Sequence, residues 1–251
     1  MAYFKQVQHI SDQVVNNLRQ LILDGRFMPG ERLPQEELAS QLGISVIPLR
    51  EGLMKLHTEN LIDLIPHRGA FVKTFNADQI EELYRMREEL EVLAIEWAIP
   101  KLSPQQIERA RQLLSEAEQL VQAGGDLHRR TWLVRLFYQV IFEATGRFYL
   151  YEAITRYYNM IYLYVRQYLS TIDLFSLHHI YREFLSAIEA RDTQKATTLH
   201  RLSHRLVREA LVTAMREREQ TSAPEAPREP EKLGSPGFEY DGVPSRASSG
   251  M

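Results

Sequence analysis

The spacing of apolar residues in the amino-terminal part of the chain predicts three short helices and then two short strands. Helical periodicity begins near residue 10, and its apolar face is formed by Ile10, Val14, Leu18, Leu21 and Ile22. The next two helices have shorter apolar faces, made by Leu38, Ala39 and Leu42 and by Leu49, Leu53 and Leu56. Two apolar runs follow, 61–65 and 70–74, and the turn between them is basic: Pro66-His67-Arg68-Gly69. This order predicts a winged helix-turn-helix over residues 1–74.

From residue 76 onward the strand signals disappear and helical spacing continues to about residue 218. The pattern predicts six helices, near 78–98, 103–123, 127–145, 147–171, 175–190 and 193–218. Six antiparallel helices make an all-α bundle over residues 76–218. Residues 219–251 have no periodicity and are rich in Pro, Gly, Ser and Glu, so we expect a disordered tail. Phe238-Glu239-Tyr240-Asp241 could be a short docking motif or part of a solvated terminus, and we assign no function to it.

Residues 43–53 follow the order of a turn and a recognition helix. Gly43 suits the turn, Ser45 can cap the next helix, and Pro48 falls in its first turn, where a missing N–H costs no hydrogen bond. Arg50 comes next, and its guanidinium fork suits a guanine edge or a phosphate. Because such a helix presents its N-terminal turn to the major groove, the segment predicts a DNA-binding helix.

Charge and cysteine content narrow the possible functions. The formal net charge of -3 excludes a globally basic nucleic-acid coat. Basic and acidic side chains are equal in number within residues 1–74, so specific binding would depend on local clustering of Arg32, Arg50, Lys55 and Arg68. A winged helix that serves only protein contacts is the alternative. The absence of cysteine excludes disulfides, thiolate metal sites and thiol nucleophiles.

The chain has no apolar run of membrane-spanning length, and its start lacks the apolar core of a signal peptide. We therefore expect a cytoplasmic protein that makes no membrane contact.

Six short motifs, in this order, resemble the DNA-binding domain of GntR-family transcription regulators: Leu23-Asp24-Gly25, Met28-Pro29-Gly30-Glu31-Arg32-Leu33, Glu37-Leu38-Ala39, Leu42-Gly43-Ile44-Ser45, Pro48-Leu49-Arg50-Glu51 and His67-Arg68-Gly69-Ala70-Phe71-Val72. The resemblance implies a homodimer that binds an imperfect palindromic operator in double-stranded DNA, usually as a repressor. It also implies release of the operator when a small effector binds the other domain. By similarity, DNA contacts fall at Arg32, Arg50, His67, Arg68 and Gly69; to these we add Ser45, Val46, Pro48 and Lys55.

Two positions depart from the family pattern. Relatives commonly carry Arg or His where this chain has Val46, which cannot donate a hydrogen bond, although its methyl groups could meet a thymine methyl. Gly52 stands where alanine is usual and lowers helix propensity by up to ~1 kcal/mol. We therefore expect an operator half-site that differs from those of typical members, read mainly by Arg50 with Arg32 and the wing.

Three later motifs resemble the FCD effector domain of FadR-type members of the family: Leu83-Tyr84-Arg85-Met86-Arg87-Glu88-Glu89-Leu90-Glu91, Phe142-Glu143-Ala144-Thr145-Gly146 and Ala187-Ile188-Glu189-Ala190-Arg191-Asp192. In many such domains one Asp and three His hold a divalent metal, which in turn binds a carboxylate effector. The matching positions here are Val134, Tyr138, Tyr181 and Ser203. These side chains are poor or impossible ligands, so we expect neither the family metal nor another cofactor.

His200 and His204 offer a displaced metal site as an alternative, because an i, i+4 spacing lets two imidazoles share an ion. No carboxylate falls at the matching place on the 127–145 helix, and Arg201 and Arg205 flank the pair. We interpret both histidines as residues of a solvated helix face.

Aromatic and basic residues remain as candidates for effector binding. The 147–171 helix carries Tyr158 and Tyr162 and is apolar nearly all round, which predicts a place at the centre of the bundle. Buried hydroxyls need partners, which a ligand or water in a cavity would supply; simple packing with the hydroxyls at the rim is the alternative. Arg87 would pair with Glu91 or with an effector carboxylate. Further candidates are Tyr138, Tyr181, Arg166 and Arg135, and the effector would be a carboxylate or a fatty acyl compound.

An enzyme built on the helical bundle is the alternative function. The sequence contains no Gly-rich phosphate loop, and we interpret Glu88, Glu89 and Glu91 as a solvated helix face rather than as acid–base groups. We therefore predict no catalytic residues and favour a DNA-binding regulator.

Overall fold

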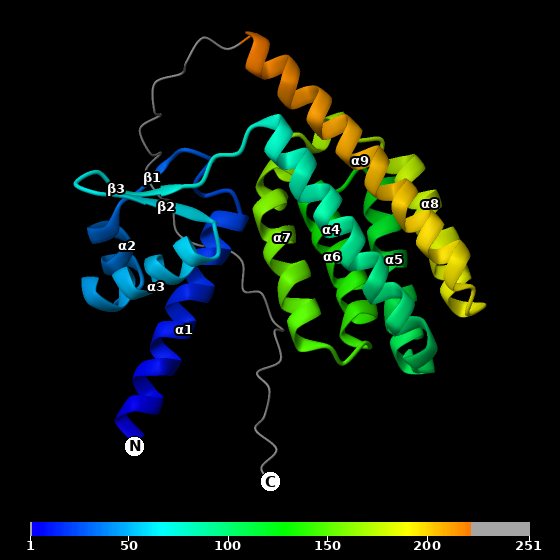
Figure 1. Ribbon diagram of the computed structural model, residues 1–251, viewed down its shortest axis with the longest axis horizontal. Helices are drawn as coiled ribbons and strands as arrows, with labels where there is room; N and C mark the ends of the chain where they lie inside the picture. Colours follow the sequence, from blue (N-terminus) through cyan, green and yellow to red (C-terminus); the bar gives the residue numbers. More distant parts are fainter. Residues whose placement is uncertain (1, 222–251) are drawn as a thin grey trace.

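The computed structural model describes residues 2–221, with side chains from residue 12 onward apart from that of residue 169. Within this range a winged-helix module and a bundle of six long helices lie side by side (Figure 1). The predicted tail lies outside the described residues except for 219–221, which belong to the last helix, and the motif at 238–241 and the side chain of Ile10 also lie outside them. No helix of the described part is long and apolar enough to cross a membrane.

The winged-helix module contains α1 (Ala2–Leu23), α2 (Gln35–Gln41) and α3 (Val46–Thr58), and the predicted hairpin forms β2 (Ile62–Ile65) and β3 (Gly69–Val72). A third strand that the sequence did not predict, β1 (Arg32–Leu33), pairs antiparallel with β3 and gives the order β1-β3-β2. It follows the Met28-Pro29-Gly30 turn, whose Gly30 N–H donates to the Val72 carbonyl and so starts the pairing. The fold is thus a winged helix-turn-helix, as predicted.

The helical module consists of α4 (Ala77–Ala98), α5 (Pro104–Gln122), α6 (Leu127–Glu143), α7 (Phe148–Gln167), α8 (Leu174–Glu189) and α9 (Thr193–Thr221). Two 3₁₀ turns, η1 (Ile99–Lys101) and η2 (Leu169–Thr171), extend α4 and α7. Local signals explain the helix starts, because Asn76 and Ser103 form capping boxes with Gln79 and Gln106. The predicted all-α bundle is confirmed.

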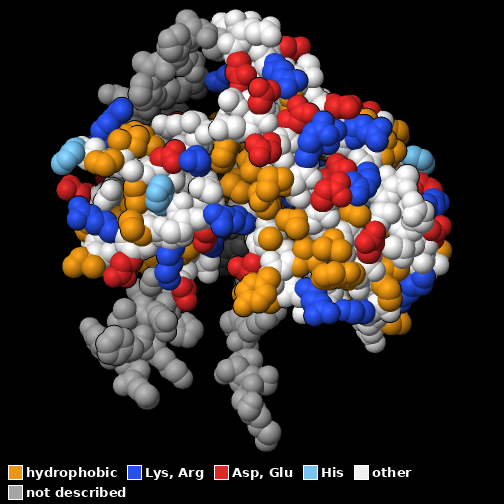
Figure 2. Space-filling model, viewed as in Figure 1, with side chains coloured by type: hydrophobic (Ala, Val, Ile, Leu, Met, Phe, Trp, Pro, Cys, Tyr) orange, Lys and Arg blue, Asp and Glu red, His pale blue; other side chains and the backbone are white. Residues whose placement is uncertain are grey.

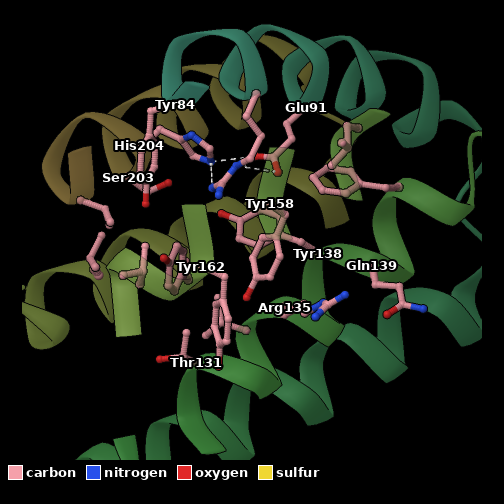
Figure 3. A pocket seen from close by; sticks show the side chains of 18 of the residues that line it. Tyr84, Glu91, Thr131, Arg135, Tyr138, Gln139, Tyr158, Tyr162, Ser203 and His204 are labelled. Carbon is pink, nitrogen blue, oxygen red and sulfur yellow. Dashed lines mark hydrogen bonds and ion pairs between the residues drawn. The ribbon is translucent and has the colours of Figure 1, made fainter. Parts of the chain in front are cut away.

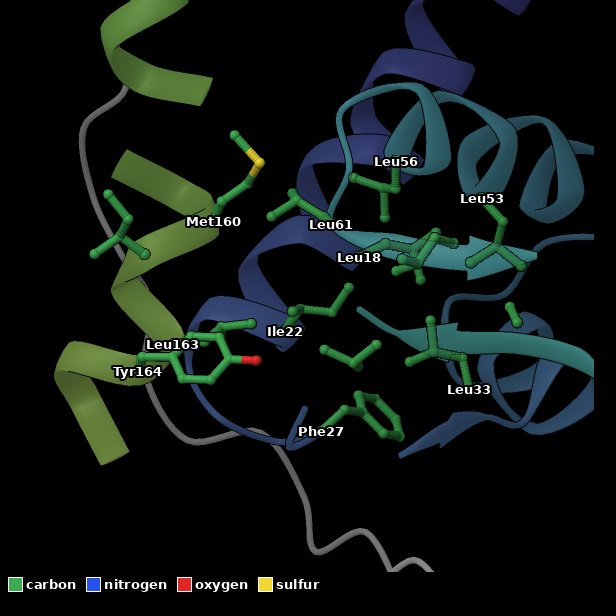
Figure 4. Packing of buried hydrophobic residues seen from close by; sticks show 14 of the residues in the cluster. Leu18, Ile22, Phe27, Leu33, Leu53, Leu56, Leu61, Met160, Leu163 and Tyr164 are labelled. Carbon is green, nitrogen blue, oxygen red and sulfur yellow. The ribbon is translucent and has the colours of Figure 1, made fainter. Parts of the chain in front are cut away.

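Helix α7 is buried between the two modules, and the prediction that it lies at the centre of the bundle is wrong. One side of α7 joins the core of the winged helix, where Met160, Leu163 and Tyr164 meet α1 (Figure 4). Helix α9 contributes Leu211, Val212 and Met215 to the same cluster. Helix α7 is therefore apolar nearly all round because two different modules cover it.

Backbone groups near the junction are bonded across it. The Phe75 N–H, in the connection between the modules, donates to the Tyr164 hydroxyl of α7 at 2.5 Å. Within the helical module, the Ala77 N–H at the start of α4 donates to Glu219 Oε1 of α9 at 2.9 Å. Arg156 Nη2 of α7 donates to the Thr58 carbonyl at the end of α3, at 2.6 Å. The end of α3 and the connection after β3 are thereby bonded to α7.

Candidate DNA-binding face and effector cavity

The recognition helix α3 begins at Val46, with Ser45 at its N-cap in extended conformation. The Ser45 side chain makes no capping hydrogen bond in the described structure, so the prediction that this side chain caps the helix is wrong. Its hydroxyl is exposed and free to approach a phosphate. Pro48 lies in the first turn, as expected, and is half-buried.

Arg50 extends from the exposed face of α3, and its Nε donates to Gln35 Oε1 of α2 at 3.2 Å. Val46 is half-buried and packs against the core, so its methyl groups face inward. The exposed apolar side chains of α3 are Ile47 and Met54, at 71% and 57% relative exposure. The sequence analysis singled out neither residue. Both lie away from the apolar face formed by Leu49, Leu53 and Leu56, and this position predicts exposure. At the start of α3, Ile47 rather than Val46 is therefore the side chain that presents its methyl groups to solvent.

The wing brings the other predicted DNA contacts together. His67 and Arg68 are exposed at the tip of the hairpin, and the Arg68 guanidinium lies 5.8 Å from the centre of the Phe71 ring. Arg32 of β1 is exposed beside Gly69, where a Cβ atom would lie 3.5 Å from its Nε. Lys55 differs from these, because its Nζ forms an ion pair with Asp12 at 2.8 Å. Figure 2 shows basic and histidine side chains over the winged-helix module, at the left.

The helical module contains a partly open cavity with a volume of about 110 Å³, lined by α4 and by α6 to α9 (Figure 3). Five of the six predicted effector residues line it: Arg87, Tyr138, Tyr158, Tyr162 and Tyr181. Arg166 does not. It lies against the winged helix, where its Nη1 is 3.5 Å from the Leu23 carbonyl oxygen. Burial raises the pKa of Tyr138, Tyr158 and Tyr181, so their hydroxyls are neutral donors and acceptors.

Glu91 lies at the cavity wall and collects three polar partners. Arg87 Nε is 3.2 Å from Glu91 Oε1, and Nε2 of His200 and of His204 are 3.0 Å and 2.7 Å from Glu91 Oε2. Glu91, His200 and His204 are all buried, so the prediction that they belong to solvated helix faces is wrong. Of the other acids in that prediction, Glu88 is half-buried beside Arg201 and Arg208, and Glu89 is exposed. The predicted Arg87–Glu91 pair is present.

The protonation states of this cluster follow from its surroundings. Burial alone would raise the pKa of Glu91, but Arg87 and then His204 hold that pKa well below its usual value. Burial, followed by the neighbouring His200, lowers the pKa of His204 to about 3, so this imidazole is neutral. Nε2 of His204 faces both Glu91 Oε2 and Arg87 Nη2, whereas its Nδ1 has no partner among the described residues.

Two further arginines line the cavity. Arg130 is 3% exposed, yet its Nε and Nη2 atoms have no hydrogen-bond partner within residues 2–221. Its guanidinium lies 5.7 Å from the centre of the Tyr181 ring. The Arg135 guanidinium lies over Tyr158 at 4.7 Å. Sequence reasoning missed Arg130, although it continues the apolar stripe of α6 through Val134, Phe137 and Ile141 at helical spacing.

The family metal does not fit this cavity. The four positions expected to hold it, Val134, Tyr138, Tyr181 and Ser203, all line the cavity, and none carries a carboxylate or an imidazole. Ligand atoms of Glu91, His200 and His204 are close enough to share an ion. However, Arg87 Nη2 lies 3.1 Å from His204 Nε2, so a guanidinium already stands where a cation would bind.

The molecule joins an exposed recognition helix and a basic wing to an all-α bundle that contains a cavity. This combination defines a winged-helix protein with a helical sensor-type module. Family comparison agrees with this description. The model for bacterial regulatory proteins of the gntR family matches residues 10–72, and the FCD domain model matches residues 82–205. The chain belongs to the GntR family, in its FadR-type branch with an FCD domain.

Named relatives are also regulators. The HTH-type transcriptional regulator McbR of Escherichia coli (strain K12) is 33% identical over 143 residues, which are 56% of this chain and 64% of McbR, just under two thirds of its length. The HTH-type transcriptional repressor GlaR of the same strain is 24% identical over 192 residues, 73% of this chain and 87% of GlaR. The solved structure of E. coli McbR/YncC has a TM-score of 0.74 at 26% identity and covers 84% of this chain and 98% of that one. These proteins are transcription regulators and not enzymes, in agreement with the sequence-based prediction.

Proposed function

We propose that this protein is a sequence-specific DNA-binding transcription regulator that responds to a small molecule bound in its helical module. The main observation in support is one exposed surface that combines the N-terminal half of α3 with the basic wing. Arg50 lies on α3, Arg68 at the wing tip and Arg32 beside Gly69. Contacts from such a surface to the DNA phosphates orient the protein on the duplex, while Arg50 and Ile47 face the base edges in the major groove.

The proposed complex is a homodimer on a palindromic operator. A two-fold dimer would place two α3 helices roughly 34 Å apart, on successive major-groove faces. Repression is the proposed outcome of binding, supported by the family resemblance and by the name of the relative GlaR. A regulator of this kind acts where the chromosome is, so we propose a cytoplasmic location.

The cavity is the proposed effector site. It is bordered by five helices, and its lining combines tyrosine rings with three guanidinium groups. We propose that no resident divalent metal takes part, because the four family positions carry no metal-binding side chain and Arg87 accompanies the remaining cluster. The effector would then be recognised by side chains alone.

Replacement of Arg50 tests the DNA-binding part of the proposal. Arg50→Ala should weaken binding to the DNA that flanks the protein's own gene by about 5- to 150-fold, because one guanidinium contact to a base edge supplies ~1–3 kcal/mol. Salt-titrated mobility shifts and footprinting would measure this loss. Arg109→Ala is the matched control, since Arg109 is exposed on α5, far from α3 in the fold. A footprint that Arg50→Ala leaves unchanged would refute this role for α3.

A further inference from the structure

We propose that the effector is a compact organic dianion, with one anionic group bound by Arg130 and the other by Arg135. This inference rests on the proposed function, which gives the cavity a ligand but does not give its chemistry. It starts from two guanidinium groups that lack a counter-charge, both on α6 and both in the cavity wall.

Arg130 is the buried half of this arrangement. The side chain is 3% exposed, and its described surroundings include the Tyr181 ring but no carboxylate partner. Nε and Nη2 point to no acceptor among the described residues, which leaves a two-pronged donor without a partner. Such a fork fits the two oxygens of a carboxylate or a phosphate. A buried cation without an anion is unfavourable, and a bound anion removes that penalty.

Arg135 lies five residues further along α6, so it leaves the helix in a different direction from Arg130 while still lining the cavity. It is half-buried, and its guanidinium stacks over Tyr158 of α7, whereas Arg130 lies against Tyr181 of α8. Figure 3 shows Arg135 beside Tyr158 and Tyr138 at the cavity. No ion pair of Arg135 occurs within residues 2–221. The two cations therefore approach the cavity from the α8 side and from the α7 side.

The charge balance of the lining calls for a dianion. Arg87 is neutralised by Glu91, and His204 carries no charge because burial holds its pKa at about 3. The tyrosines are neutral as well. Arg130 and Arg135 are therefore the uncompensated charges among the described lining residues, and a ligand with two negative charges restores neutrality.

Size restricts the ligand further. A volume of about 110 Å³ has room for several water molecules, which suits a short organic acid. The Tyr158 hydroxyl and Nδ1 of His204 have no partner in the described part of the chain. Each could therefore form a hydrogen bond with a hydroxyl group of the ligand. The expected ligand is thus a short chain with a carboxylate group at each end.

The test measures binding of defined compounds to the full chain by calorimetry and thermal shift, with and without chelator. The probes are dicarboxylates from malonate to adipate and monocarboxylates of matched length, with 3-phosphoglycerate, which carries a charge of about −3 at neutral pH, as a comparison. We expect at least one dianion to bind about tenfold or more tightly than its monocarboxylate match, because each charge-assisted contact supplies a tenfold or larger factor. Binding of 3-phosphoglycerate tighter than that of every dicarboxylate would overturn the match to two charges.

Variants connect this preference to the two arginines. Arg130→Met and Arg135→Gln should each weaken binding of the dianion about tenfold or more, while Arg109→Gln on the exposed face of α5 leaves it unchanged. Arg130→Met should also keep or raise the melting temperature of the ligand-free protein, because it removes an uncompensated buried charge. A merely structural role for Arg130 would lower that temperature.

The possible failures can be told apart. Equal binding of dianions and monocarboxylates, or dianion binding that both variants leave intact, would overturn the inference while the cavity remained an effector site. Tight binding that chelator abolishes would overturn it in favour of a metal. If operator binding persists and no compound of any class binds the chain, both the inference and the proposed effector control fail, whereas the DNA-binding proposal stands.

Discussion

Glu91 is the residue around which the polar interior of the helical module is organised. It is 4% exposed and interacts with Arg87 on its own helix and with His200 and His204 on α9. The i, i+4 pair with Arg87 could be predicted from sequence, because both residues lie on one helix. The burial of the two histidines could not, since their partner belongs to another helix and no local pattern encodes that contact.

His204 should make the stability of the module depend on pH. Its pKa is about 3 in the folded chain and near 6.5 when unfolded, so the unfolded chain binds more protons as the pH falls between these values. Stability is then complete above pH 6.5 and decreases towards pH 3, with a slope of up to about 1.4 kcal/mol per pH unit. Urea unfolding at several pH values would show a smaller slope for His204→Gln. His179→Gln, which alters an exposed histidine, should keep the original slope; equal slopes in both variants would contradict this role.

Among the elements, helices were predicted well because each has a periodic face and local stop signals. Ser103 and Pro104 start α5, and their cap geometry matches the sequence pattern. Strand β1 was missed because two residues are too short to alternate, and only their pairing with β3 defines the strand. Tyr158 and Tyr162 were found through the aromatic density of α7, whereas Arg130 was missed because an arginine is rarely buried without a paired acid, and no local pattern marks the exception.

The contact between α7 and the turn after α1 should be sensitive to a single methyl group. Gly25 has a φ of +72°, and an added Cβ would lie 2.8 Å from Arg166 Nε. Gly25→Ala should therefore lower the free energy of unfolding by the ~1–2 kcal/mol expected for a left-handed backbone, plus the smaller cost of moving the flexible Arg166 guanidinium aside. Gly43→Ala is the matched control, since Gly43 has a φ of +63° and open space around its Cβ position.

Denaturant unfolding of the two glycine variants would measure the difference. Combining Gly25→Ala with Arg166→Ala should recover the steric part of the loss, because the guanidinium then no longer stands in the way. Equal losses for Gly25→Ala and Gly43→Ala would show that Arg166 does not press on this turn.

At the scale of the whole molecule, α7 connects the effector cavity with the winged helix. Tyr158 and Tyr162 line the cavity, while Met160 and Tyr164 lie in the core shared with α1. A ligand that moves the first pair must move the second, because all four belong to one rigid helix. We expect this helix to carry the coupling between effector and operator.

Met160→Ala should reduce that coupling. The lost side chain leaves a void between α7 and α1, so a shift of α7 is transmitted less completely. The ratio of operator affinities without and with a saturating dianion should fall towards one, from the 5- to 150-fold range of about 1–3 kcal/mol that is typical of allostery. Affinity for the dianion without DNA should stay the same. Met86→Ala, at a side chain 43% exposed on α4, serves as control, and an unaltered ratio in Met160→Ala would exclude this route.

The two-sided burial of α7 also limits how this protein can diversify. A substitution on α7 that adapts the cavity to a new compound also disturbs the fit with the winged helix, so ligand preference and gene response cannot drift independently there. Helices α6 and α8 also line the cavity, but the core shared with the winged helix is formed on the bundle side by α4, α7 and α9. We therefore expect related regulators to change their chemical specificity through α6 and α8, and to preserve the residue volumes of α7.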